Sequence, residues 1–171
     1  MPILGIDPGD HTGYAIVDNK QIITTGEIIY TQKKKLKHME ELLYLDAIRK
    51  IYREFKPDLV VIETNFMGRF IAVVKALTKK LVIITLAVKM EYPEALIIPT
   101  APQEWKKLLD IPPKTKYNLT PEKEKVQAKI RELLLIEKAD LSEIQKITDN
   151  EHISDSVAMC FAYEGKVRIK R

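Results

Sequence analysis

The sequence predicts an α/β fold in which a mixed five-stranded sheet, three antiparallel strands followed by two parallel ones, is flanked by helices. Three strand-like segments open the chain with short connections between them, as in a β-meander. Strand-like and helical segments then alternate, which is typical of parallel strands joined by helical crossovers. The length of 171 residues favours one domain, residues 1–171.

The three opening strands are expected at 3–7 (ILGID), 13–18 (GYAIVD) and 21–30 (QIITTGEIIY). A turn containing Pro8 and Gly9 follows the first strand, and the polar residues 18–20 separate the second from the third. Because all three are consecutive and closely spaced, each is expected to pair antiparallel with the next.

The middle of the chain alternates between helix and strand. Residues 36–55 place apolar side chains at helical spacing, and Pro57 with Asp58 ends this helix. Residues 58–63 (DLVVIE) form a short continuous apolar run, as expected for a strand buried on both faces. A helix over 68–90 and a strand over 94–100 follow.

The rest of the chain is expected to be helical apart from one loop. A short helix over 101–109 precedes the loop 110–120 (DIPPKTKYNLT). The next helix should have Thr120 as N-cap and Pro121 as its first residue, and run to about Leu135. Two more helices are expected at 140–148 and 152–163.

Composition narrows the class of protein. A hydrophobic share of 46 % and a charged share of 30 % are typical of a globular chain. Lysines interrupt the most apolar long stretch, 70–90, so a membrane span is not expected. The single cysteine, Cys160, indicates a reducing compartment, and the cytoplasm is the expected location. The net charge of +4 permits a polyanionic partner without requiring one.

Four side chains are candidates for a metal site. Asp7 closes the first strand and Glu63 closes the strand 58–63, while His152 and Asp155, three apart, share one face of the last helix. Each has an ordinary structural explanation when taken alone. Together, two strand ends and a helix across them would gather carboxylates whose repulsion a cation must offset. Hard oxygen ligands suit Mg²⁺ or Mn²⁺, and two such ions roughly 4 Å apart can support phosphodiester cleavage.

Three segments carry a resemblance to a known family. IDPG followed by TGYAIV, then VVIETNFM, then HISDSVA near the C-terminus resemble the RuvC family of Holliday junction resolvases, from Ile3 to about Tyr163. The resemblance implies an RNase H-like fold and a homodimer formed through the 70–90 helix. It also implies symmetric cleavage of a four-way DNA junction in recombination and repair, leaving a 5′-phosphate and a 3′-hydroxyl.

The resemblance also implies roles for the four candidates. Asp7 would bind both of two Mg²⁺ ions, for which Mn²⁺ would substitute, and Glu63 would bind one ion and help to position the attacking water. His152 and Asp155 would complete the site. An aspartate is frequent in the family where His152 stands, so we expect weaker retention of Mg²⁺ and a stronger preference for Mn²⁺. Glu151 is a lower-ranked candidate ligand, about one helical step away.

The predicted DNA contacts also come from the resemblance. An aromatic residue after the catalytic glutamate lies at the DNA in the family, and Phe66 matches it, with Met67 beside it and Arg69 as a phosphate partner. Two further segments, QEWKKLL and PEKEKVQ, resemble family segments that supply lysines close to the scissile phosphate. Lys106 matches the lysine of the first segment and Lys123 that of the second. Lys107 and Lys125 are the alternatives if the register differs by one or two residues. The loop 110–120 is longer than the family leads us to expect.

Other functions stay open at this point. A nuclease of the same fold that cuts other branched DNA or structured RNA would have the same four site residues. An actin-like ATPase also opens with a hairpin like GIDPG, but needs a second phosphate hairpin and a far longer chain. An inactive nucleic-acid-binding module would not need the three carboxylates of Asp7, Glu63 and Asp155 together. Whether a branch-migration motor is a partner is not determined by the sequence.

Overall fold

The computed structural model describes residues 1–30, 37–64, 71–113 and 120–167. Its centre is a sheet of β1 (Ile3–Asp7), β2 (His11–Asp18), β3 (Gln21–Ile29), β4 (Leu59–Glu63) and β5 (Leu96–Thr100), in the order β3-β2-β1-β4-β5. The first three strands pair antiparallel, while β4 pairs parallel with both β1 and β5. This confirms the predicted mixed five-stranded sheet.

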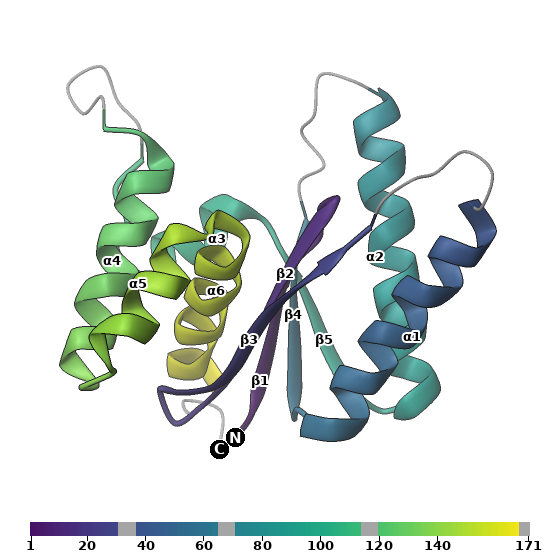
Figure 1. Ribbon diagram of the computed structural model, residues 1–171, viewed down its shortest axis with the longest axis horizontal. Helices are drawn as coiled ribbons and strands as arrows, with labels where there is room; N and C mark the ends of the chain where they lie inside the picture. The colour runs from purple at the N-terminus through teal and green to yellow at the C-terminus, as the bar shows by residue number, and fades with distance from the viewer. Residues whose placement is uncertain (31–36, 65–70, 114–119, 168–171) are drawn as a thin grey trace.

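Helices cover both faces of the sheet (Figure 1). Helices α1 (Lys37–Phe55) and α2 (Ile71–Glu91) lie on one face, and their apolar residues form one core with Leu4, Ile6 and Ile62. The other face carries α3 (Pro102–Leu108), α4 (Glu122–Ile136), α5 (Leu141–Asp149) and α6 (Glu151–Val167). Alternate residues of a strand point to opposite faces, so the central strands β1 and β4 supply both cores, and each carries its single acidic residue at its last position.

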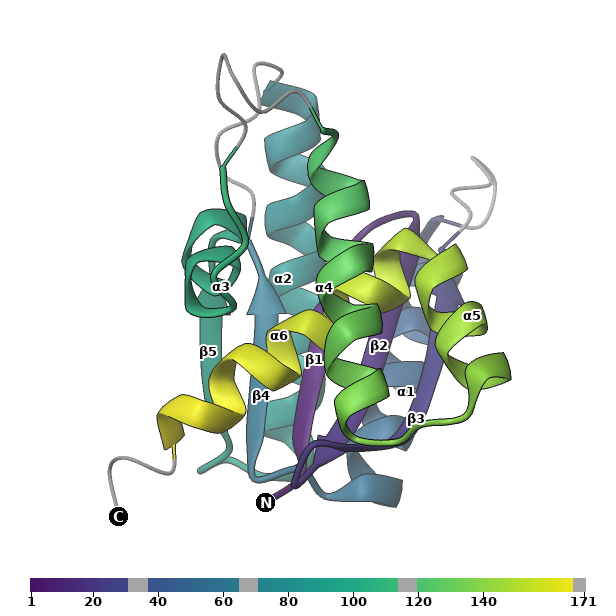
Figure 2. The ribbon, with the colours of Figure 1, turned by 90° about the vertical axis from the view of Figure 1, so that its left-hand side faces the viewer.

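Helix α6 crosses the sheet, as Figure 2 shows, and contacts the first four strands. It contains Cys160, a free cysteine that is fully buried in the core between the helix and the sheet. Among the described helices, none is long and apolar enough to span a membrane.

One predicted helix start is wrong by a residue. Helix α4 begins at Glu122 with Pro121 as its N-cap, and no side chain caps it. Thr120 and Pro121 were expected at the N-cap and first positions. The difference arises because Pro121 has ψ 140°, which is extended, so its carbonyl accepts from Lys125 N–H while Pro121 itself stays outside the helix.

Candidate active site

Asp7 lies at the end of β1, where the chain turns towards β2. It is 9 % exposed, and a hydrogen-bonded turn follows it. The hydroxyl of Thr12 donates to the Gly9 carbonyl at 2.9 Å and lies 2.9 Å from the hydroxyl of Tyr44 on α1. Because Thr12 is fully buried, these bonds fix the turn and therefore the direction in which the strand presents Asp7.

A buried lysine from the second helix of the same face also holds this turn. Lys80 of α2 is 4 % exposed, and its Nζ donates to Asp10 Oδ1 at 2.8 Å. The same Nζ lies 5.0 Å from the centre of the Tyr30 ring, within the range of a cation–π contact. The turn after Asp7 is thus tied to both α1 and α2.

Two glycines let α6 approach the sheet closely enough to bring His152 to Asp7. A Cβ on Gly5 would overlap the Ser156 carbonyl, and one on Gly13 would overlap the backbone of His152. Gly13 pairs with Asp7 in the β1–β2 register. As a result, His152 Nδ1 lies 2.6 Å from Asp7 Oδ2, although the two residues are 145 positions apart in the chain.

Glu63 ends β4, the parallel neighbour of β1, so its carboxylate lies at the same end of the central strands as Asp7. The indole Nε1 of Trp105, on α3, donates to Glu63 Oε2 at 2.9 Å. Asp155 lies three residues beyond His152 on α6 and is close enough to Glu63 and Asp7 for their charges to raise its pKa. The structure therefore brings together all four side chains that the sequence predicts.

The electrostatics of this cluster are those of crowded carboxylates. Burial, followed by the negative charge of Asp7, raises the pKa of Glu63 to about 7. Burial also raises the pKa of Asp155 to about 8, with further contributions from the charges of Glu63 and Asp7. The hydrogen bond to Asp7 raises the pKa of His152, against the opposite effect of burial. A nearby positive charge would relieve all of this repulsion.

The donor set fits a hard divalent cation by its chemistry. Three carboxylates supply the oxygen ligands that Mg²⁺ and Mn²⁺ prefer, and the imidazole can bind Mn²⁺ as well. In the described parts of the chain, no three such side chains are yet close enough to hold an ion. The direct contact between His152 and Asp7 involves Oδ2 of the Asp7 carboxylate.

Of the predicted DNA contacts, two lie in the described residues. Lys106 is next to Trp105, and its charge lowers the pKa of both Glu63 and Asp155, so it faces the cluster. Lys123 lies further out, where its Nζ forms a 3.0 Å ion pair with Glu151. Phe66, Met67 and Arg69 lie outside the described residues.

The two alternative lysines differ from Lys106. Lys125 is buried and donates to the carbonyls of Pro112 and Pro113 at 3.3 and 3.2 Å, so it holds the start of the loop after α3. Lys107 is exposed on α3. Lys106 is the one of the three that counts among the main influences on the pKa values of Glu63 and Asp155, both of which it lowers.

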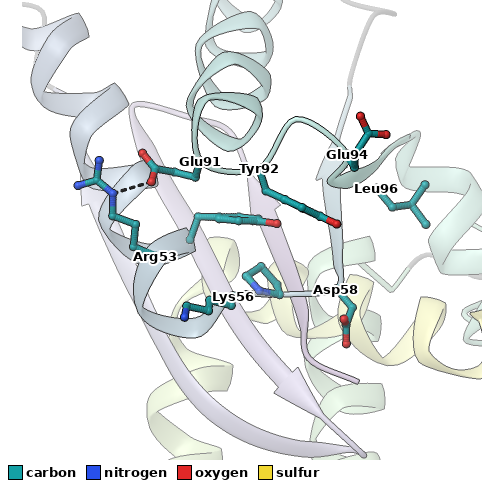
Figure 3. A pocket seen from close by; sticks show the side chains of 9 residues that line it. Arg53, Lys56, Asp58, Glu91, Tyr92, Glu94 and Leu96 are labelled. Atoms are coloured by element: carbon teal, nitrogen blue, oxygen red, sulfur yellow. Dashed lines mark hydrogen bonds and ion pairs between the residues drawn. The ribbon is translucent and has the colours of Figure 1, made fainter.

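A cavity of about 710 Å³ lies at the opposite end of β4 (Figure 3). It is lined by the end of α1, the residues before β4, the end of α2 and the start of β5. Arg53 and Glu91 form an ion pair at its wall, with Tyr92, Glu94 and Leu96 beside them. None of the predicted site residues lines this cavity, so its size does not make it the catalytic centre.

Sequence reasoning did not single out three residues that shape the site: Trp105, Thr12 and Tyr44. In the sequence, Trp105 was noted only as a member of the segment QEWKKLL, next to the predicted DNA contact Lys106. Its bond to Glu63 joins residues 42 positions apart, and no local pattern reports such a contact. The same holds for Thr12 and Tyr44, which are 32 positions apart.

A family model described as crossover junction endodeoxyribonuclease RuvC matches residues 3–163. A search of the curated proteins finds no significant match.

Solved structures show the fold. Thermus thermophilus RuvC in complex with a Holliday junction substrate has a TM-score of 0.76 at 18 % identity, covering 99 % of this chain and 96 % of that one. The fowlpox virus resolvase, in complex with Holliday junction DNA, has a TM-score of 0.60 at 16 % identity, covering 98 % and 99 %. The yeast mitochondrial Holliday junction resolvase Ydc2 has a TM-score of 0.61 at 14 % identity, covering 99 % and 81 %.

Proposed function

The chain belongs to the RuvC family of crossover junction endodeoxyribonucleases, and from this premise we propose that Asp7, Glu63, His152 and Asp155 form its catalytic site. The enzyme is an endonuclease whose substrate is the four-way DNA junction. The observation that supports the assignment best is the 2.6 Å contact between Asp7 and His152 beside two carboxylates of raised pKa.

Divalent metal dependence is general in this family, and we propose two Mg²⁺ ions, with Mn²⁺ able to replace them. When bound, such ions supply a water of lowered pKa and stabilise the oxygen that leaves the phosphorus. Asp7, between the other ligands, would contact both ions. Glu63 and Asp155 would each hold one ion, and His152 would contribute its imidazole.

The protein groups have further tasks around the scissile phosphate. Glu63, at the rigid end of β4, would orient the attacking water, and Lys106 would neutralise charge that develops on the phosphate oxygens. Water attack on the phosphorus with departure of the 3′ oxygen leaves a 5′-phosphate and a 3′-hydroxyl. Lys123, Phe66, Met67 and Arg69 are proposed to contact the DNA.

The junction has two symmetry-related strands to cut, so we propose a homodimer formed through α2. Val82, Leu86 and Met90 are 59 %, 50 % and 52 % exposed, and their spacing of four residues places them on one face of that helix. A cytoplasmic location is also proposed, because the substrate is DNA and Cys160 is a free thiol.

Cleavage of a synthetic four-way junction tests the proposal, with Mg²⁺ or Mn²⁺ and with EDTA as the metal-free control. Linear duplex, a flap and hairpin RNA serve as competing substrates. We expect paired symmetric nicks in the junction alone, and at least ~10³-fold less cleavage by Asp7→Asn, which keeps the shape of the side chain but loses its charge. Cleavage of flaps or RNA with the junction spared would assign the site to a different nuclease of this fold.

A further inference from the structure

Trp105 is the single tryptophan of the chain, and its position is unusual for a core residue. It is fully buried on α3, among apolar residues that include Val157 and Ile130. A buried indole N–H requires an acceptor. Here the acceptor is Oε2 of Glu63, at 2.9 Å, and not a backbone carbonyl.

The ring of Trp105 also contacts the cation next to the site. Lys106 Nζ lies 5.2 Å from the ring centre, within cation–π range, and pairs with Glu122 at 3.0 Å. One buried side chain therefore contacts both Glu63, through its ring edge, and Lys106, through its ring face.

We propose that Trp105 is a positioning residue that sets the orientation of the Glu63 carboxylate for metal binding and holds Lys106 beside it. This inference rests on the proposed role of Glu63 as a metal ligand. By donating to Oε2, the indole restrains rotation of the carboxylate, and Oε1 would then be the oxygen that binds an ion.

An indole is well suited to this task because it is a donor that carries no charge and does not titrate. A lysine or a protonated histidine in its place would orient Glu63 equally well, but would compete with the metal for its negative charge. Trp105 thus holds the Glu63 carboxylate by a 2.9 Å hydrogen bond without adding a competing cation.

The test compares Trp105→Phe with the unmodified protein and with Ile130→Val, a control in the same core cluster. Phenylalanine keeps an aromatic face for Lys106 and removes only the N–H donor and part of the volume. We expect the Kd for Mn²⁺, measured by calorimetry, to rise about 10-fold or more in Trp105→Phe. In Ile130→Val it should stay within about 2-fold of the unmodified protein, as expected for a core change away from the site.

Two further readouts separate positioning from a purely structural role. High Mn²⁺ should restore the cleavage rate of Trp105→Phe towards that of the unmodified protein, and junction binding without metal should be unchanged. A Mn²⁺ affinity equal to that of the unmodified protein in a folded Trp105→Phe would overturn the inference.

Fluorescence of the unmodified protein provides a test that needs no variant to fold. Because Trp105 is the single tryptophan, Mn²⁺ bound at Glu63 should quench its emission saturably, with the same Kd that calorimetry gives. Saturating Mn²⁺ that leaves the emission unchanged contradicts the inference. Both tests measure metal binding, so they stand even if the protein fails to cut junctions.

Discussion

The contact between Asp7 and His152 couples the protonation of the imidazole to the charge of the carboxylate. At 2.6 Å, the imidazole donates to the carboxylate, and the bond raises the pKa of His152. A protonated imidazole is a cation, so it offsets part of the negative charge of the cluster. A divalent ion at Asp7 would compete with that proton, which connects the metal preference of the site to a single residue.

We predict that His152→Asp shifts the metal preference towards Mg²⁺. The change removes a neutral or cationic group and adds a fourth carboxylate, so the Mg²⁺ concentration for half-maximal cleavage should fall ~10-fold. The measurement is a titration of junction cleavage with Mg²⁺ and with Mn²⁺ over a range of pH. Equal activity of the variant and the unmodified protein, in both metals at every pH, would show that His152 does not set the preference.

The pKa values also predict how metal binding depends on pH. Glu63 and Asp155, with pKa values of about 7 and about 8, hold protons near neutrality in the metal-free protein. Because metal ligands must be deprotonated, Mn²⁺ affinity should rise ~10-fold per pH unit for each proton released, between pH 6 and 8. Calorimetry in buffers of different ionisation enthalpy counts those protons, and a flat affinity over this range would contradict the prediction.

The same shifts make the metal-free fold less stable as pH rises. A group whose pKa is higher in the folded than in the unfolded state stabilises the fold when protonated, and that stability is lost as pH rises through its folded pKa. Glu63, Asp155 and His152 all shift in this direction. We expect the Tm in EDTA to fall between about pH 4 and pH 8 from these groups, and Mn²⁺ to raise it most at pH 8. Asp155→Asn should reduce both effects.

At the scale of elements, the site depends on how closely α6 approaches β1 and β2. Gly5 and Gly13 leave no side chain between the strands and the helix backbone. This closeness places His152 against Asp7 and directs Asp155 towards Glu63. Helix α6 therefore positions two of the proposed site residues, His152 and Asp155. Its distance from the sheet decides whether they reach the ends of the strands.

We predict that Gly13→Ala separates α6 from the sheet and abolishes most of the activity. The new Cβ would overlap the backbone of His152, which cannot rotate away. The variant should lose about 2 kcal/mol of stability and ~100-fold or more in cleavage rate, since small misplacements of catalytic groups are costly. Gly26→Ala is the matched control, because the three atoms nearest to its Cβ belong to the side chain of Tyr14 and not to the backbone. Equal cleavage rates for Gly13→Ala and Gly26→Ala would argue that the close packing of α6 on the sheet does not position the site residues.

The elements themselves could be predicted largely from sequence, because each depends on local patterns. Short apolar runs identified β1 and β4, apolar residues at helical spacing identified α1, and the order of strands and helices led to the mixed sheet. The gathering of Asp7, Glu63, His152 and Asp155 was predicted from strand ends and the family resemblance. The Trp105–Glu63 bond and the overlap at Gly13 depend on the packing of α3 and α6 on the sheet, which no local pattern specifies. The start of α4 depended on the ψ angle of one proline.

At the scale of the whole molecule, the helices on the two faces of the sheet carry different features. The face covered by α3 to α6 carries His152, Asp155, Trp105 and Lys106 (Figure 1). The other face carries α1 and α2, and α2 presents Val82, Leu86 and Met90 to solvent. Lys80 of α2 also donates to Asp10 in the turn after Asp7. A dimer formed through α2 would therefore be linked to the turn that follows Asp7, a residue of the proposed site.

The proposed dimer leads to a prediction with a control matched in exposure. Leu86→Glu places a charge on the exposed apolar face of α2 and should weaken the dimer by about 2 kcal/mol or more, which is ~30-fold in Kd. Leu135→Glu changes a leucine of α4 that is 51 % exposed, against 50 % for Leu86, so it should leave the dimer intact. Sedimentation equilibrium measures the assembly, and a junction held in a supercoiled plasmid reports whether both strands are cut in one encounter.

For Leu86→Glu, we expect monomers that bind Mn²⁺ normally and produce single nicks in place of paired ones. The Mn²⁺ affinity should persist because every proposed ligand comes from one chain. If Leu135→Glu dissociates the protein while Leu86→Glu leaves it dimeric, the interface lies on α4. The two active sites would then face the junction from the opposite side of the sheet, and Lys80 would have no part in linking the dimer to the turn that follows Asp7.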